Sequence, residues 1–274
     1  MSPDALGTVH PPVAAGAPLR IVSLVPSLTE LLCELGLQPY LVGRTGFCIH
    51  PRAQVQSIEK VGGTKDVRSD RIRALAPTHL IVNIDENEKP TIDALASAIP
   101  HVIVTHPQTP HDNLALYRLF GALFAAVPGV NARADALCDR FTAAMAALTA
   151  RPALPQRRVL YCIWQDPWMT VGRQTYIGQM LALIGWRQWK EAAQMAGTPA
   201  RYPVFSWSSA LVEQLDLILL STEPYSFGEK HADQLERQTG KPVLLIDGEM
   251  LSWYGSRAIA GLDYLGRLRA ISGD

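Results

Sequence analysis

Two side chains that could ligate a metal stand two residues apart in the stretch Phe47-Cys48-Ile49-His50. Thiolate and imidazole both bind transition metals, so this pair could meet the metal of a bound chelate. A second set of histidines, His101, His106 and His111, lies at the start of an expected strand and in the loop after it. Solvated loop histidines are the alternative for both groups, and we predict no resident metal site.

Aromatic side chains are distributed unevenly along the chain. All six tryptophans fall in the second half of the chain, in or next to expected strands and turns. Trp164 and Trp168 follow an expected strand, Trp207 precedes an expected helix, and Trp253 lies in a later loop. Loops at the carboxyl ends of parallel strands share one edge of a sheet. We therefore expect a flat aromatic wall that suits a large planar ligand, with core packing as the alternative.

Motifs of familiar enzyme classes are missing from the sequence. It contains no G-x-S-x-G, H-E-x-x-H, phosphate-binding loop or dinucleotide-binding glycine pattern. Val61-Gly62-Gly63-Thr64-Lys65 has the wrong glycine spacing for a phosphate loop and is read as a turn. A formal net charge of +0 gives no reason to expect nucleic acid or an anionic membrane as partner. We predict a non-enzymatic protein with no catalytic residues and no catalytic cofactor.

The elements that position these loops begin with a strand pattern over residues 21–25. Leucines then repeat at helical spacing up to Gly36, which is typical of a helix end. Ser27 and Glu30 have the spacing of a capping box, which predicts that their side chains close the helix start. The turn around Ser27 would then border a ligand site.

The second half of the chain repeats the order of the first. Residues 158–162, 212–221 and 239–246 echo residues 20–24, 73–83 and 98–105. This pattern predicts an α/β fold with two lobes of mostly parallel sheet, joined by one long rigid helix, and a ligand cleft between the lobes. The predicted parts are a disordered tail (1–18), an N-terminal lobe (19–127), the interlobe helix (128–152) and a C-terminal lobe (153–274).

The order and spacing of several motifs resemble a known family. The motifs are residues 20–30, 41–43, 61–63, 70–77, 80–82 and 158–160, and the likeness extends over nearly all of 19–271. The chain resembles the class III solute-binding proteins of ABC importers, also called helical backbone metal receptors, which bind iron siderophores, haem or vitamin B12. The resemblance implies a cobalamin-like corrinoid as ligand, with haem or a ferric chelate as the alternative.

The members that bind vitamin B12 are the nearest functional comparison, and they imply a set of cleft positions. Thr64, Asn83 and Val204 stand where those members have large aromatic residues, and tryptophans elsewhere would compensate. Ile163 also falls at a cleft position. The expected ligand-binding set comprises Ser27, Phe47, His50, Thr64, Asn83, Trp164, Trp168, Met169, Phe205, Trp207, Glu249 and Trp253.

The same resemblance implies delivery of a small metal chelate to an ABC permease. Asp70 fits the docking acid of the first lobe, whereas the second-lobe position falls near Ser208 or Ala210, where no acid stands. The first residues lack the basic and apolar regions of a signal peptide. We therefore expect a cytoplasmic monomer, or a periplasmic one if an export signal has been replaced. A binding protein without an importer and a metallocofactor-metabolism protein on this scaffold remain alternatives.

Overall fold

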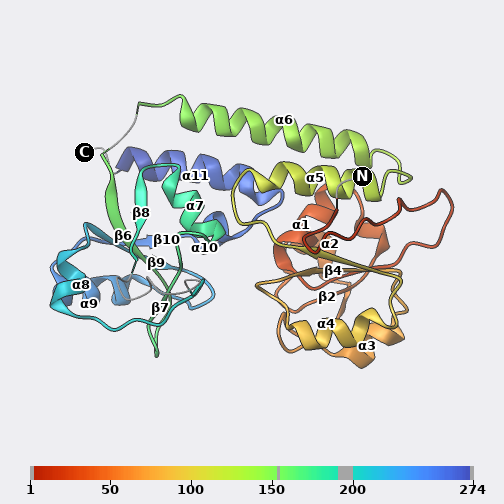
Figure 1. Ribbon diagram of the computed structural model, residues 1–274, viewed down its shortest axis with the longest axis horizontal. Coiled ribbons are helices and arrows are strands. Elements are labelled where there is room, and N and C mark those ends of the chain that lie inside the picture. The colour runs from red at the N-terminus through yellow and green to blue at the C-terminus, as the bar shows by residue number, and fades with distance from the viewer. Residues whose placement is uncertain (1–2, 153–154, 191–199, 272–274) are drawn as a thin grey trace. The chain divides into compact units, whose positions relative to one another are not determined.

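The computed structural model describes residues 3–152, 155–190 and 200–271. It divides into two compact units, each built around a five-stranded sheet. The first unit comprises Met1–Pro107, His111–Thr142 and Tyr254–Arg257; the second comprises Gln108–Pro110, Ala143–Trp253 and Ala258–Asp274. The boundary falls inside α6 (Val130–Thr149), a helix of 20 residues and about 30 Å (Figure 1). The expected α/β fold with one long connecting helix is confirmed.

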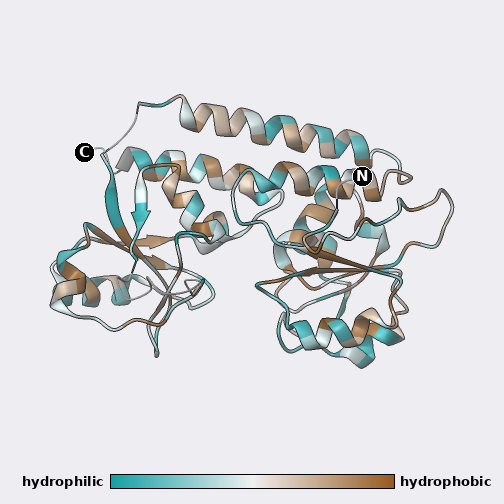
Figure 2. Ribbon diagram, viewed as in Figure 1, coloured by the Kyte–Doolittle hydropathy of each residue, from teal (hydrophilic) through white to brown (hydrophobic). Residues whose placement is uncertain are grey.

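The sheet of the first unit is entirely parallel. Its strands are β1 (Ile21–Ser23), β2 (Leu41–Arg44), β3 (Glu59–Lys60), β4 (His79–Asn83) and β5 (His101–Thr105), in the order β3-β2-β1-β4-β5. Helices connect them: α1 (Pro26–Glu34), a 3-10 turn (Gln38–Tyr40), α2 (Arg52–Val55), α3 (Ser69–Ala74), α4 (Lys89–Ala96) and α5 (Asp112–Leu123). Figure 2 shows β4 in the hydrophobic colour, as expected for a strand covered on both faces.

The sheet of the second unit is mixed. Its strands are β6 (Arg157–Trp164), β7 (Met169–Thr170), β8 (Trp186–Gln188), β9 (Leu217–Ser221) and β10 (Val243–Ile246). The path runs β10-β9-β6-β7, and β8 also pairs with β6. Among the strands that the structure describes in this sheet, β6 and β7 are antiparallel and the other pairs are parallel. The helices are α7 (Tyr176–Ala182), α8 (Ser209–Glu213), α9 (Glu229–Thr239), α10 (Gly248–Ser252) and α11 (Arg257–Ile271). The segment after the expected strand that carries Trp164 and Trp168 thus forms a short hairpin of β6 and β7.

The prediction of a capping box at the start of α1 is wrong. The N-cap is Val25, which has no side-chain oxygen, and Pro26 is the first helical residue. Proline at this position lacks the N–H that a cap would satisfy and already has a helical φ. Ser27 is therefore inside the helix and 3% exposed. The Glu30 carboxylate instead forms an ion pair with Arg257, at 2.7 Å from Nη2.

The N-terminal segment packs against the first unit, although its composition predicted a disordered tail. The amide of Ala5 donates to the carbonyl of Val104 in β5 at 2.9 Å. The amide of Val13 donates to the carbonyl of Leu123 at 2.8 Å. The Asp4 carboxylate is buried and accepts hydrogen bonds from amides of its own turn. These tertiary contacts offset the chain entropy that a Pro- and Gly-rich segment loses on ordering.

Within the described part of the chain, no helix is both long enough and apolar enough to cross a membrane.

Candidate functional site

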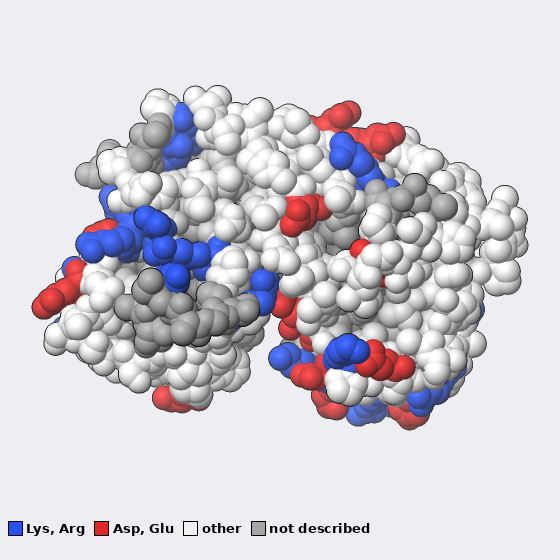
Figure 3. Space-filling view, in the orientation of Figure 1, with Lys and Arg blue, Asp and Glu red and all other residues white. Residues whose placement is uncertain are grey.

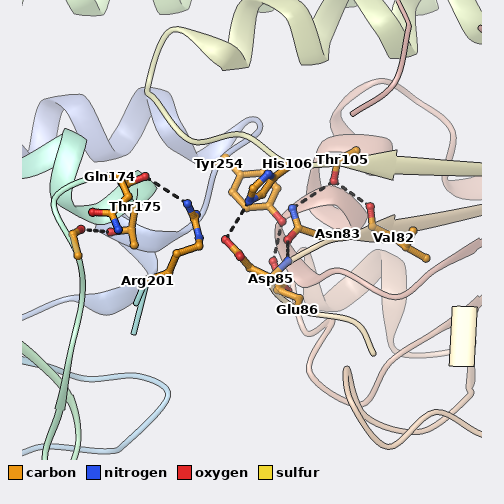
Figure 4. A network of polar contacts seen from close by, with 11 residues as sticks. Val82, Asn83, Asp85, Glu86, Thr105, His106, Gln174, Thr175, Arg201 and Tyr254 are labelled. Atoms are coloured by element: carbon orange, nitrogen blue, oxygen red, sulfur yellow. Dashed lines mark hydrogen bonds and ion pairs between the residues drawn. The ribbon is translucent and has the colours of Figure 1, made fainter. Parts of the chain in front are cut away.

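Polar side chains gather at the carboxyl ends of β1, β4 and β5 in the first unit. Asn83 ends β4, is 3% exposed, and donates through Nδ2 to the Thr105 hydroxyl at 3.3 Å (Figure 4). Asn87 holds three segments together, because Oδ1 accepts from the Asn83 amide and Nδ2 donates to the carbonyls of Leu24 and Thr64. These hydrogen bonds hold the loops after β1, β3 and β4 together.

Two acidic side chains follow Asn83 in the same loop. The Asp85 carboxylate lies 3.4 Å from Nε2 of His106, both side chains being about four-fifths buried. Glu86 accepts a 2.6 Å hydrogen bond from the hydroxyl of Tyr254. Burial, and then the Glu86 charge, raises the pKa of Tyr254 well above its ordinary value, so the phenol stays protonated and donates. The loop edge is therefore rich in oriented donors and acceptors (Figure 4).

The residues of the stretch Phe47-Cys48-Ile49-His50 differ in their exposure to solvent. Phe47 is 63% exposed, and His50 is half-buried. Cys48 is fully buried, and its sulfur accepts a hydrogen bond from the Thr29 hydroxyl at 3.1 Å. Burial raises the pKa of the Cys48 thiol, so it stays neutral and is inaccessible to a ligand. Of the two metal-ligand candidates in this stretch, Cys48 is excluded by its burial, and His50 is the more exposed.

The three histidines at β5 do not form one group. His101 begins β5 and stacks on His79, whereas His106 follows the opposite end of the strand. His111 is exposed just before α5. Among the described residues, no three His, Cys, Asp or Glu side chains lie close enough together to hold a metal ion.

In the second unit, four of the expected ligand-binding aromatics belong to one cluster. Trp168 lies at its centre, parallel to Phe227 at a centroid distance of 5.7 Å and perpendicular to Trp207 at 5.5 Å. The cluster comprises Trp164, Trp168, Trp189, Phe205, Trp207, Tyr225, Phe227 and His231. Interplanar angles range from 10° to 89°, so the rings pack in three dimensions and not as the expected flat wall.

Burial divides this aromatic cluster into a core part and a surface part. Phe205 and Phe227 are 7% and 4% exposed and lie against the sheet. Trp164 is 39% exposed and meets the cluster through the edge of Tyr225. Tyr225 and Phe227 were not among the expected ligand-binding residues. Their position in the loop after β9, another carboxyl-end loop, was the signal that could have found them.

Trp253 belongs to a different site in the second unit. Its indole Nε1 donates to Glu223 at 2.8 Å, and Ser252 donates to the same oxygen at 2.8 Å. Glu223, Asp247 and Glu249 line a pocket of about 350 Å³ beyond the ends of β9 and β10, together with Thr222, Leu245 and Ile246. Burial, and to a lesser extent the Glu249 charge, raises the pKa of Glu223. We call these three carboxylates the acidic edge.

The remaining expected residues occupy varied positions. Thr64 is half-buried and uses its carbonyl to accept from Asn87. Met169 is half-buried in β7, where it bridges to Val204, which is 55% exposed. Ile163 is 9% exposed in β6. A second pocket, of about 410 Å³, is lined by Trp207, Ser208, Ser209, Val212, Glu213, Gln238 and Thr239.

Comparison with known proteins identifies the class of protein that carries these sites. The family model described as "Periplasmic binding protein" matches residues 21–241. The chain belongs to this family of substrate-binding proteins, in agreement with the expectation of a non-enzymatic role.

The names of individual relatives mention two ligands, vitamin B12 and haem. The vitamin B12-binding protein of Photorhabdus laumondii is 24% identical over 208 residues, covering 75% of this chain and 71% of that protein. The periplasmic vitamin B12-binding protein BtuF of Vibrio cholerae has a TM-score of 0.75 at 19% identity, covering 92% of this chain and 97% of that one. The haem-binding protein RhuT of Roseiflexus sp. RS-1, in its apo form, has a TM-score of 0.74 at 23% identity, covering 94% and 100%.

Proposed function

We propose that this protein binds a cobalamin-like corrinoid and delivers it, in the periplasm, to an ABC importer. The observation that carries the choice of ligand is the acidic edge of the second unit, where Glu223, Asp247 and Glu249 line one pocket. The rim of cobalamin carries neutral amides, whose N–H groups are donors for carboxylates. The rim of haem carries two carboxylates, which such an edge repels.

Exposed apolar side chains support the same proposal. Phe47 in the first unit is 63% exposed in the loop after β2, and Trp164 in the second unit is 39% exposed as the last residue of β6. Large apolar side chains left in the open are typical of ligand-contacting surfaces when polar groups surround them. A macrocycle with an apolar face and an amide rim matches both features. Six other members of the expected set are half-buried and keep their proposed roles as ligand contacts: His50, Thr64, Trp168, Met169, Trp207 and Glu249. Four members are buried and would support the ligand-contacting loops from behind: Ser27, Asn83, Phe205 and Trp253.

Haem is the second candidate, and the likeness to RhuT motivates it. His50 is then the axial ligand, because it is half-buried in an exposed loop and Cys48 is inaccessible. Haemin titrated into the protein would give a Soret band that shifts in His50→Ala. An unshifted Soret band in this variant would remove His50 from that role.

Replacing one carboxylate of the acidic edge tests the choice of ligand. In Glu249→Gln, haemin should bind roughly fivefold more tightly, since about 1 kcal/mol of like-charge repulsion is removed. Cobalamin should bind roughly fivefold more weakly, because a charged acceptor becomes a neutral one. Calorimetric titration of both ligands measures the ratio of the two dissociation constants. The matched control is Glu236→Gln, an exposed residue on α9 of the same unit. A ratio that moves equally in both variants contradicts the role of Glu249.

Asp70 is proposed as a docking residue for the permease. It is exposed in the first turn of α3, a region where Figure 3 shows acidic and basic side chains side by side. A charge at the rim of an interface mainly sets the association rate. Asp70→Asn should therefore slow association with the permease by roughly tenfold at low salt and leave ligand affinity unchanged. Surface plasmon resonance on reconstituted permease measures this, with Asp135→Asn on α6 as control; equal rates for the two variants contradict the proposal.

A further inference from the structure

The N-terminal segment closes the open edge of the first sheet. β5 is the last strand in the order, so one side of its backbone has no strand partner in that sheet. Val104 in β5 donates its N–H to the Asp4 carboxylate at 3.2 Å and accepts the Ala5 N–H at 2.9 Å. Unpaired strand edges template pairing with other chains, so this cover has a protective role.

A buried carboxylate holds the segment in this position. Asp4 is 7% exposed, and its two oxygens accept from the amides of Leu6, Thr8 and Val104. The fourth partner is Nε2 of His10, at 3.1 Å with both side chains almost fully buried. The turn formed by residues 3–10 is thus tied to β5 through one side chain.

Three imidazole rings lie where the segment meets the sheet. His10 meets His101 edge to face at a centroid distance of 6.1 Å, and His101 stacks on His79 at 4.8 Å. His79 is 3% exposed, its Nδ1 contacts the Thr78 hydroxyl, and its Nε2 has no hydrogen-bond partner. A buried ring nitrogen without a partner is stable only while the ring is neutral.

Charge determines how this cluster responds to acid. Burial, then the neighbouring His101 and His10, lowers the pKa of His79 to about 4, and burial also lowers the pKa of His101. The Asp4 carboxylate contacts the ring of His10. The ring of Phe124 packs against His79. The guanidinium of Arg20, the residue before β1, donates hydrogen bonds to the carbonyl of Leu75. A second proton in the cluster therefore meets a like charge and low solvation.

From this geometry we propose that residues 3–10 form an acid-released latch on β5, with the stacked rings of His79 and His101 as its sensor. Neutral rings permit the segment to dock, and protonated rings repel one another and draw in water. Because the docked state lowers the pKa of His79 and His101, the released state binds more protons. Docking is therefore strongest above the ordinary histidine pKa of about 6.5 and weakens as pH falls towards 4. Release leaves the N–H and C=O of Val104 open to pairing.

Amide hydrogen exchange of the apo protein tests the latch directly. After correction for intrinsic exchange rates, the protection of the Ala5 and Val104 amides should fall roughly tenfold between pH 7 and pH 5. The Leu80 amide in β4 should keep its protection over this range, since release is local. Unchanged protection at Ala5 and Val104 would overturn the proposal, and so would a parallel loss at Leu80, because that is general acid unfolding.

Two variants and a control assign the sensor. In His79→Phe, the pH dependence at Ala5 should shrink to less than about threefold, because the ring with the pKa of about 4 is gone. In His101→Gln it should also become smaller than in the unchanged protein, because the neighbouring charge that lowers the pKa of His79 is gone. Two variants are used because His79 is buried and its replacement can disturb packing. His111→Gln removes an exposed histidine of the same unit and should leave the tenfold change intact. A tenfold change that persists in both cluster variants would overturn the assignment.

Discussion

Trp168→Ala should lower the free energy of unfolding of the second unit by about 3 kcal/mol. Trp168 touches Phe205, Trp207 and Phe227, so its removal leaves a cavity at the centre of the aromatic cluster. The ring is half-buried, which places the loss at the lower end of the range for large-to-small changes at tryptophan. Urea unfolding followed by circular dichroism measures the loss as a lower midpoint at unchanged slope.

Trp164→Ala is the matched control for this prediction. Trp164 is 39% exposed and meets the cluster through Tyr225, so its loss should cost about 1 kcal/mol. The binding proposal gives the opposite ranking for ligand affinity, because the exposed ring is the one available to a ligand. Equal destabilisation by the two variants would contradict the division of the cluster into core and surface parts.

Arg257→Gln should destabilise the first unit by about 2 kcal/mol. The Arg257 guanidinium binds both oxygens of Glu30, with Nη2 at 2.7 Å and Nε at 2.8 Å, and the side chains are 13% and 19% exposed. Removal of the guanidinium leaves a carboxylate with little water around it. The loss should appear in urea unfolding, and a double-mutant cycle with Glu30→Gln should give a coupling energy above about 1 kcal/mol.

The control for this pair is the exposed ion pair between Arg140 and Glu34. Its side chains are 56% and 46% exposed, and one contact of 2.9 Å joins them. Such surface pairs are worth between about 0 and 1 kcal/mol. A coupling energy for Glu30 and Arg257 no larger than that of the control would show that the Tyr254–Arg257 segment is held by its other contacts, such as the Gly255 amide to Asn113 at 2.6 Å.

Local sequence patterns predicted the central strands and the order of the elements. The runs that became β1, β4, β6 and β9 are short and apolar, bounded by breakers, and the two halves repeat one another. Residues 163–175 were harder, because a two-residue strand such as β7 has too little sequence to show a period. The capping box failed because Ser27 has the right spacing to Glu30 but the helix starts one residue earlier, at Pro26.

The candidate site was predictable only where residue type and loop position suffice. Trp164 was selected as an aromatic residue after an expected strand, and Phe47 as a cleft position implied by the family resemblance; both are exposed. Glu223 was missed, since its significance comes from burial beside Trp253 and Glu249, which are distant in sequence. Cys48 was considered a metal ligand because a sequence does not show which way a loop side chain faces. Tertiary contacts determine burial, charge and orientation, and these decide the chemistry.

Direct binding of cobalamin tests the proposed function most sharply. Apo protein titrated with cobalamin in a calorimeter should give saturable one-site heat with micromolar or tighter affinity, and the bound ligand should quench tryptophan fluorescence. Haemin and a ferric siderophore, titrated under the same conditions, should bind more weakly, because the acidic edge disfavours their anionic groups. Absence of heat and of quenching with cobalamin, alongside saturable binding of either iron chelate, would contradict the corrinoid proposal.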